Sequence, residues 1–282
     1  MLAIIGGTGL YQLEAVKVIE ELQLSTPYGA HSGPITRAEY QGRKLLFLPR
    51  HGATHSLMPH EVNYRANIWA LKRLGALQVI GVSAVGSLQA EIKPGDFSVP
   101  SGYFDFVKGP REKSFFGEGL VAHVSTAKTT CPALTRAIAD CATELDLTLH
   151  LNTSYAGVDG PRLGTKVESI FLKEQARCHL VGMTNVPEAF LAREAQLCYA
   201  TLCAVTDYDC WMEDETQHVS VADVIARYRE SIERAKALLE LMLTRPAPPI
   251  DPIHREVLRA SLLTPKESLN EKKRALFELL SR

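Results

Sequence analysis

Residues 77–87 read LQVIGVSAVGS, an almost uninterrupted apolar run that ends in small residues. Such a run is typical of a strand covered on both faces, as in parallel or mixed sheets between layers of helices. Other short strand-like runs lie at 2–7, 44–50, 97–106, 153–161, 180–183 and 199–209. Segments with helical periodicity lie between and after them, at 63–75, 131–147, 165–177, 185–198 and 219–243. This alternation predicts an α/β domain with a largely parallel or mixed sheet.

The run PAPPIDP, residues 246–252, is the one obvious linker. It divides the chain into a domain of residues 1–245 and a Pro-rich linker with a C-terminal helical extension, residues 246–282. In the extension, Thr264 followed by Pro265 predicts the N-cap and first position of a terminal helix. We expect this helix to dock on the body of the domain or on a neighbouring subunit.

Charge and composition exclude several classes of protein. The 31 basic and 32 acidic residues give a formal net charge of −1, without the basic excess of nucleic-acid binders. No apolar stretch approaches the ~20 residues that span a bilayer, and the N-terminus has no signal-peptide pattern. The cysteines show no CxxC spacing and the histidines no HExxH motif. We therefore expect a cytoplasmic protein with reduced thiols, no metal, no nucleic-acid partner and no membrane contact.

Three strand ends carry small residues together with groups that bind anions. They are IIGGTGL at 4–10, PRHGATH at 49–55 and VSAVGS at 82–87. Besides free backbone amides, the candidate donors are Thr8, Arg50, His51, His55 and Ser83. Ligands of α/β sheets bind beyond the carboxyl ends of the strands, so the three segments together predict a site for an anion about the size of phosphate. Taken singly, the glycines would serve only to turn the chain, and the arginine would form a surface salt bridge.

Two further strand ends carry groups suited to a sugar and a base. In VGMTNVPE, Met183 is flexible and apolar enough to lie under a sugar ring, and Thr184 adds a hydroxyl. Glu188 in the same motif begins a helix, where capping explains a carboxylate. In AVTDYDCW a buried strand ends at two acids, Asp207 and Asp209. A site that hands a proton to a flat, aromatic group would explain acids at this place, with Trp211 close behind.

In order and spacing these segments resemble the trimeric nucleoside phosphorylase family, and most closely its methylthioadenosine phosphorylase branch. The matching motifs are GGTGL, RHG, PHEVNYRANIWALK, GS before IKPGD, GPR, VGMTNVPE, LAREAQLCYA and TDYDCW. The resemblance runs from residue 3 to about residue 240. It implies a single domain with a central mixed sheet or distorted barrel flanked by helices. It also implies a homotrimer that uses inorganic phosphate as co-substrate and needs no cofactor.

The resemblance assigns roles to individual residues. The groups that hold phosphate are Thr8, Arg50, His51, Ser83, Thr184 and the backbone amide of Ala84. Met183 contacts the ribose, and the side chains around the 5′ group are His55, Val221, Val224 and Ile225, with His123 of the partner subunit. Asp207 touches purine N7 and the 6-substituent as the catalytic acid, with Asp209 nearby.

The implied reaction is reversible phosphorolysis of 5′-methylthioadenosine to adenine and 5-methylthioribose-1-phosphate, in purine and methionine salvage. Asp207 suits the 6-amino donor of adenine, whereas 6-oxopurine enzymes of the family carry Asn at that place. The branch tends to have Ser where this chain has Gly164, so one hydroxyl contact to the base is missing or is replaced by water or by Thr165. The alternative is a broader purine nucleoside phosphorylase that accepts adenosine, inosine or methylthioinosine.

Overall fold

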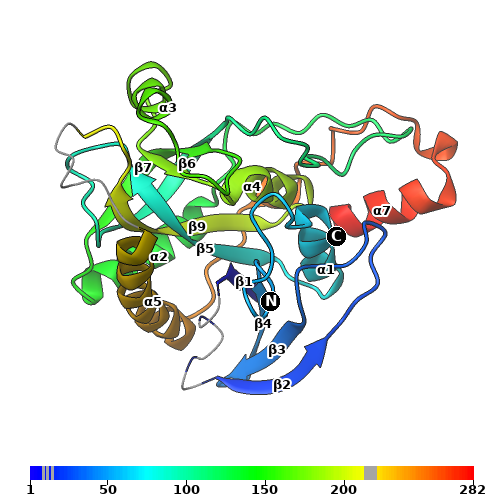
Figure 1. Cartoon of the computed structure of the whole chain (residues 1–282). Coiled ribbons are helices and arrows are strands. Elements are labelled where there is room, and N and C mark those ends of the chain that lie inside the picture. Colours follow the sequence, from blue (N-terminus) through cyan, green and yellow to red (C-terminus); the bar gives the residue numbers. More distant parts are fainter. Residues whose placement is uncertain (8–9, 11–12, 14–15, 213–220) are drawn as a thin grey trace.

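The computed structural model describes the chain apart from residues 8–9, 11–12, 14–15 and 213–220 and the side chains of residues 221–225 (Figure 1). The strands are β1 Leu2–Gly6, β2 Lys17–Leu22, β3 Ile35–Tyr40, β4 Arg43–Pro49, β5 Gln78–Ser87, β6 Phe97–Asp105, β7 Leu149–Gly157, β8 Leu180–Gly182 and β9 Cys198–Tyr208. The helices are α1 Tyr64–Arg73, α2 Pro132–Glu144, α3 Lys166–Ile170, α4 Asn185–Glu194, α5 Val221–Thr244, α6 Pro252–Arg255 and α7 Glu271–Ser281. A π-helical turn, Phe171–Gln175, continues α3.

The strands form one mixed sheet in the order β2–β3–β4–β1–β5–β8–β7–β6–β9. Because β9 also pairs with β5, the strands β5, β8, β7, β6 and β9 close into a barrel, and β1 to β4 extend the sheet beyond it. The pairs β1–β4, β1–β5, β5–β9, β6–β7 and β7–β8 are parallel, whereas β5–β8 and β6–β9 are antiparallel. The predicted α/β fold with a mixed sheet or distorted barrel is confirmed.

Strands β2 and β3 have no counterpart in the apolar pattern of the sequence. β2 is exposed along nearly its whole length, and β3 does not alternate strictly between buried and exposed residues. They pair with each other and β3 pairs with β4, all antiparallel, at the edge of the sheet. β2 buries no side chain, and the buried residues of β3 are not evenly spaced, so neither strand shows the regular alternation that would reveal it in the sequence.

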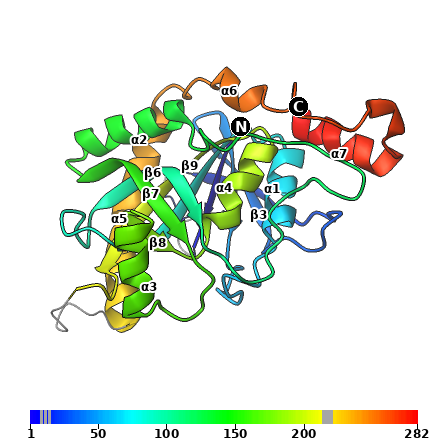
Figure 2. The ribbon, with the colours of Figure 1, turned by 90° about the horizontal axis from the view of Figure 1, so that it is seen from above.

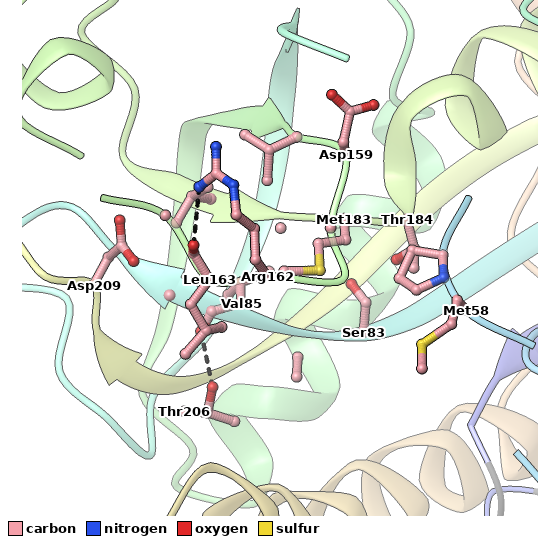
Figure 3. A pocket seen from close by; sticks show the side chains of 18 of the residues that line it. Met58, Ser83, Val85, Asp159, Arg162, Leu163, Met183, Thr184, Thr206 and Asp209 are labelled. Carbon is pink, nitrogen blue, oxygen red and sulfur yellow. Dashed lines mark hydrogen bonds between the residues drawn. The ribbon is translucent and has the colours of Figure 1, made fainter. Parts of the chain in front are cut away.

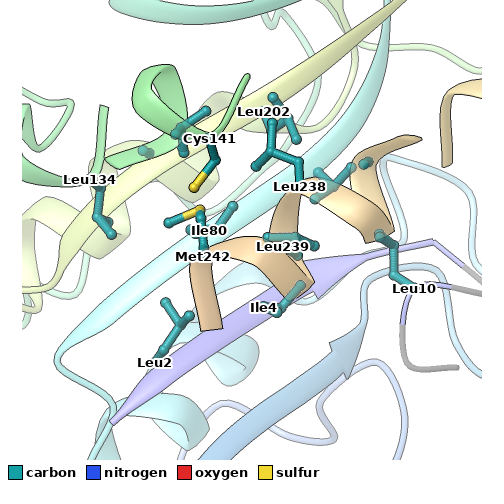
Figure 4. Close-up of a cluster of buried hydrophobic side chains, with 14 of the residues drawn as sticks. Leu2, Ile4, Leu10, Ile80, Leu134, Cys141, Leu202, Leu238, Leu239 and Met242 are labelled. Carbon is teal, nitrogen blue, oxygen red and sulfur yellow. The ribbon is translucent and has the colours of Figure 1, made fainter. Parts of the chain in front are cut away.

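Helices cover both faces of the sheet (Figure 2). On one face, Leu134 of α2 and Leu238 of α5 belong to a buried cluster with Ile4 and Ile80 (Figure 4). On the other face, α1 and α4 share a second cluster, to which α7 contributes Leu276. Within the described ranges, no helix is long and apolar enough to cross a membrane.

The C-terminal extension packs back onto the rest of the chain. Gln78 at the start of β5 donates a hydrogen bond to the carbonyl of Pro248 at 2.9 Å. Ala122, in the segment between β6 and α2, forms an antiparallel bridge with Leu262. The extension is therefore tied both to the sheet and to the long connection that follows β6.

The predicted start of the terminal helix at Thr264 is wrong. α7 begins at Glu271, and the side chain of Asn270 caps it by accepting the Lys273 N–H at 2.9 Å. The residues after Thr264 form only a short 3₁₀ turn, after which the backbone is extended. The Thr264 hydroxyl accepts the Val121 N–H at 2.8 Å, so it serves the bridge to the β6–α2 connection instead of a helix.

Candidate active site

A cavity of about 800 Å³ lies where β5, β8 and β9 end (Figure 3). Ser83 and Thr184 lie on one side of it, and Thr206 and Asp209 lie on the other. The predicted site residues that line it are Arg50, His51, His55, Ser83, Ala84, Met183, Thr184, Asp207 and Asp209. The structure thus brings together the segments predicted to bind an anion and those predicted to bind a sugar and a base.

The remaining predicted site residues are not in this group. Thr8 and the side chains of Val221, Val224 and Ile225 lie outside the described residues. His123 is exposed and does not line the cavity. Its N–H donates to the carbonyl of Ser261 at 3.0 Å, so the C-terminal extension supports it.

Parallel strand pairing places these segments at one edge of the sheet. β1 and β4 end side by side, and the Arg50 N–H donates to the Gly6 carbonyl at 2.9 Å. β5 and β9 are also parallel, with Gly86 opposite Asp207 after a shift in register. A Cβ on Gly86 would lie 3.0 Å from Asp207 Oδ1 and 3.3 Å from Asp209 Cβ. This shift in register, a β-bulge, places both acids next to Gly86, where only a residue without a side chain leaves room for them.

Arg50 is held by a partner that the sequence did not reveal. Its Nε and Nη2 both donate to the Glu188 carboxylate at 2.7 Å, and its Nη1 donates to the Val82 carbonyl at 2.8 Å. The Tyr199 hydroxyl also donates to Glu188, and both ions of the pair are almost completely buried. Burial lowers the pKa of Arg50, but Glu188 more than offsets this and keeps the guanidinium charged. The expected capping role of Glu188 is wrong, because its carboxylate neutralises and orients Arg50.

His51 is neutral in this environment. Burial, and then the charge of Arg50, lowers its pKa to about 4. Its Nδ1 lies 2.9 Å from the Leu57 carbonyl, and its ring stacks on His55 with centroids 4.6 Å apart. A carbonyl only accepts hydrogen bonds, so Nδ1 carries the proton and Nε2 is an acceptor. The imidazole therefore differs from the simple donor that the sequence suggested.

Asn185 connects the two hydroxyls expected to hold an anion. Its Oδ1 lies 3.2 Å from Ser83 Oγ and 3.4 Å from Thr184 Oγ1, and its side chain is fully buried. The Tyr155 hydroxyl accepts the N–H groups of Thr184 and Asn185. These contacts fix the turn between β8 and α4. In the sequence, the feature that could have indicated this role is an Asn close after the end of an apolar strand.

Arg111 fixes the wall of the cavity that carries Met183. Its Nη1 donates to the carbonyls of Met183 at 2.6 Å and Val186 at 2.9 Å. Its Nη2 donates to the carbonyl of Asp159. One buried guanidinium thus ties the ends of β7 and β8 to each other, although it lies far from both in sequence.

Asp207 has the properties of a proton donor. Burial raises its pKa from 3.8 to about 6, the Thr206 hydroxyl at 2.6 Å lowers it, and neighbouring Asp209 raises it. Burial also raises the pKa of Asp209. At neutral pH Asp207 is therefore protonated in a fraction of the protein molecules. The protonated carboxyl group is the state that a general acid needs.

Trp211 holds the segment that follows β9 in place. Its Nε1 donates to the Ser87 carbonyl at 2.8 Å, and Lys173 lies over its ring at 3.1 Å from the centroid. The indole packs beside a buried cluster that includes Leu172. It thus anchors the end of β9 without lining the site.

Arg162 pairs with Glu168 through two bonds of 2.8 and 2.7 Å at the entrance of the cavity. Thr165 caps α3 in a reciprocal arrangement, since its hydroxyl accepts the Glu168 N–H and Glu168 accepts the Thr165 N–H. In the part of the chain that the structure describes, no three His, Cys, Asp or Glu side chains form a group that could hold a metal ion.

One cavity of the barrel thus combines a buried arginine and hydroxyl groups with a buried acid. The model of the phosphorylase superfamily matches residues 1–244, and the chain belongs to this family. Two similar curated relatives are named S-methyl-5′-thioadenosine phosphorylase. The one from Hyperthermus butylicus is 46% identical over 89% of this chain and 90% of the relative. The one from Synechocystis is 43% identical over 94% of this chain and 82% of the relative.

Solved structures agree with these relatives. A methylthioadenosine phosphorylase from an antarctic soil metagenomic library superposes with a TM-score of 0.91 and 38% identity, over 99% of this chain and 98% of the other. A methylthioadenosine phosphorylase from Schistosoma mansoni, in complex with adenine, superposes with a TM-score of 0.85 and 32% identity, over 93% and 98% of the two chains.

Proposed function

We propose that the chain catalyses the reversible phosphorolysis of 5′-methylthioadenosine to adenine and 5-methylthioribose-1-phosphate, with inorganic phosphate as co-substrate and no cofactor. The observation that carries this proposal is one cavity in which Arg50 and Ser83 lie among anion-binding groups and Asp207 is a buried acid with a raised pKa. The names of the relatives favour the methylthio nucleoside within the family.

At the phosphate end, the groups proposed to hold the dianion are Thr8, Arg50, His51, Ser83, Thr184 and the amide of Ala84. Glu188 keeps Arg50 charged and in place. Neutral His51 accepts, at Nε2, a hydrogen bond from the one hydroxyl group of the phosphate dianion. The bond from a phosphate oxygen to the anomeric carbon forms as the bond to the base breaks. The anion also stabilises the positive charge that develops on the sugar, while Met183 contacts the ribose.

At the base end, Asp207 is proposed to donate its proton to purine N7, so that the electron pair of the broken glycosidic bond leaves with a neutral base. General acid help of this kind is worth about 10²–10⁴-fold in rate. The second oxygen of the same carboxyl group accepts from the 6-amino group of adenine. A 6-oxopurine would present an acceptor to that oxygen, and such a buried mismatch discriminates strongly between substrates.

At the 5′ end, the side chains proposed to surround the methylthio group are His55, Val221, Val224 and Ile225. His123 of the partner subunit closes this pocket in a homotrimer. His123 lies outside the cavity of its own chain, as this arrangement requires. We also propose a cytoplasmic location, and a catalytic unit of residues 1–245 with residues 246–282 as an extension that supports the segment carrying His123.

The test is base release from 5′-methylthioadenosine, adenosine, inosine and methylthioinosine, each with and without inorganic phosphate. We expect release to depend on phosphate and kcat/KM to be highest for 5′-methylthioadenosine. Equal cleavage without phosphate would mean hydrolysis, and higher kcat/KM for either 6-oxopurine nucleoside would support the broader purine nucleoside phosphorylase. Light scattering tests the trimer, and a monomer would remove His123 from the site.

A further inference from the structure

Tyr228 is a polar side chain of the cavity to which the proposed function assigns no role. It belongs to α5, is partly buried and lines the cavity. A Cβ on Gly7 would lie 3.1 Å from the Tyr228 hydroxyl, so this hydroxyl reaches the residue that follows β1. Among the described residues, the hydroxyl has no hydrogen-bond partner. Its proton is therefore available to a ligand in the cavity.

The backbone that Tyr228 reaches is part of the end of the cavity proposed to bind phosphate. Gly7 follows Gly6, whose carbonyl accepts the Arg50 N–H at 2.9 Å. Burial raises the pKa of Tyr228, and the charge of Arg50 lowers it by a smaller amount. The hydroxyl therefore keeps its proton at neutral pH and acts as a donor. Tyr228 thus places an uncharged donor near Arg50.

Arg50 itself has few hydrogen-bond donors left for an anion. Its Nε and Nη2 donate to Glu188, its Nη1 donates to the Val82 carbonyl, and its Nη2 lies 3.4 Å from the Ile5 carbonyl. Within the described part of the chain, these bonds leave one N–H of Nη1 without a partner. The Glu188 carboxylate also offsets the positive charge of the guanidinium. A phosphate dianion at this place therefore needs donors besides Arg50.

The two hydroxyls expected to hold the anion donate elsewhere. Ser83 Oγ lies 3.2 Å and Thr184 Oγ1 lies 3.4 Å from Asn185 Oδ1. An amide oxygen only accepts hydrogen bonds, so each hydroxyl directs its one proton to Asn185. To donate to an anion, each would give up its bond to a buried oxygen, which costs free energy. A donor that is not already engaged binds the anion at a lower cost, and Tyr228 is such a donor.

We propose that the Tyr228 hydroxyl binds the phosphate co-substrate by donating to one of its anionic oxygens. A hydrogen bond from a hydroxyl to an oxyanion is charge-assisted and roughly twice as strong as one between neutral groups. The bond compensates in part for the charge of Arg50 that Glu188 neutralises. This inference rests on the proposed function, because that function makes phosphate the ligand at this end of the cavity.

The position of Tyr228 on α5 suggests one alternative role. Tyr228 is three and four positions after Ile225 and Val224, so it lies on the same face of the helix as these two residues, which are proposed for the 5′ end. There its hydroxyl would favour a 5′-hydroxyl group, and hence adenosine over 5′-methylthioadenosine. The place of the hydroxyl next to Gly7 favours the phosphate instead, because β1 and β4 end side by side there and Arg50 directly follows β4.

Tyr228→Phe tests the proposal, because it removes the hydroxyl and keeps the ring. The KM for phosphate should rise about tenfold or more, the net value of one hydrogen bond to a charged group, whereas the KM for 5′-methylthioadenosine at saturating phosphate should stay within about twofold of the parent. Tyr40→Phe is the matched control, since Tyr40 is on β3 and outside the cavity. It should change neither KM.

Stability and substrate preference distinguish the other outcomes. Tyr228→Phe should be at least as resistant to urea as the parent, because the lost hydroxyl has no partner among the described residues. The ratio of kcat/KM for adenosine to kcat/KM for 5′-methylthioadenosine, at saturating phosphate, should be unchanged. An unchanged KM for phosphate would overturn the proposal, and a fall in this ratio at the same time would assign Tyr228 to the 5′ end. A loss of stability with equal rises in both KM values would show a structural role and would overturn the proposal as well.

Calorimetric titration with inorganic phosphate separates this inference from the proposed function. The parent should bind phosphate, and Tyr228→Phe should weaken this binding about tenfold or more, while Tyr40→Phe leaves it unchanged. If 5′-methylthioadenosine is not cleaved but this binding pattern is found, the proposed function fails and the role of Tyr228 stands. If the nucleoside is cleaved only with phosphate present but both variants bind phosphate like the parent, the role of Tyr228 fails and the proposed function stands.

Discussion

The protonation of Asp207 affects both the catalytic activity and the stability of the fold. The substitution Asp207→Asn tests both effects. Burial raises the pKa of this carboxyl from 3.8 to about 6 in the folded protein, with a lowering contribution from Thr206 and a raising one from Asp209. In the unfolded chain the pKa returns to its ordinary value. Between about pH 4 and pH 6 the folded state therefore binds more protons than the unfolded state, and the free energy of unfolding falls as the pH rises through this window.

The size of both effects follows from the pKa. A difference of about two units corresponds to ~3 kcal/mol at 1.36 kcal/mol per unit. Asn has the shape of Asp without its charge, so Asp207→Asn should raise the free energy of unfolding by up to ~3 kcal/mol at pH 7 and by almost nothing near pH 4. The same change removes the proton donor, so turnover of 5′-methylthioadenosine should fall about 10²–10⁴-fold. The residual activity should shift toward 6-oxopurines, because the amide can donate to a 6-oxygen.

Urea unfolding from pH 4.5 to pH 8 and the pH profile of kcat/KM measure these effects. In the parent protein kcat/KM should fall about tenfold per pH unit above about pH 6, because only protonated Asp207 can donate a proton. In the variant kcat/KM should not show this fall. Asp140→Asn, on the exposed face of α2, is the control and should change neither quantity. A stability gain that is the same at every pH, or an unchanged ratio of 6-amino to 6-oxo turnover, would refute the role given to Asp207.

Three other substitutions test the supports of the site. Glu188→Gln leaves the buried charge of Arg50 without its counter-ion, so urea unfolding should show that the free energy of unfolding falls by about 3–5 kcal/mol. Steady-state kinetics should show a higher KM for phosphate. Arg111→Lys replaces a planar fork that binds several carbonyls with a single ammonium, so the KM for the nucleoside should rise more than the KM for phosphate. Asn270→Ala removes the cap of α7 and should lower the free energy of unfolding by about 1 kcal/mol without changing kcat.

The parts of the site that the sequence predicted lie in the last part of buried strands or directly after them. Arg50 and Met183 follow an apolar run, whereas Ser83 and Asp207 lie in the second half of one, and the parallel pairing of such strands brings their ends to one edge. This inference needs only the hydrophobic pattern and the general placement of ligands in α/β folds. It fails for β2, which buries no side chain, and for β3, whose buried residues do not alternate regularly with exposed ones.

The groups that support the site were not predictable, because their partners are far away in sequence. Glu188 looks like a helix cap locally, and only the fold places it 2.7 Å from Arg50 across 138 positions of the chain. Arg111 reaches the ends of β7 and β8 from an irregular segment that shows no periodicity. The cap of α7 was misplaced for a similar reason, since the hydroxyl of Thr264 is used by Val121. In each of these cases a contact with residues far away in sequence determines the role of the side chain, and the local sequence does not show that contact.

Strand β5 links the proposed phosphate site to the proposed proton donor. Ala84, whose amide is proposed to hold phosphate, and Gly86, which lies opposite Asp207, are two residues apart on this strand. An extended chain rises about 3.3 Å per residue, so these two backbone positions are about 6–7 Å apart. Because Ala84 and Gly86 both pair with β9, and Gly86 also pairs with β8, this spacing is set by backbone pairing and not by a loop. A shift in the register of β5 would therefore impair phosphate binding and protonation of the base together, whereas side-chain changes in the cavity would affect them separately.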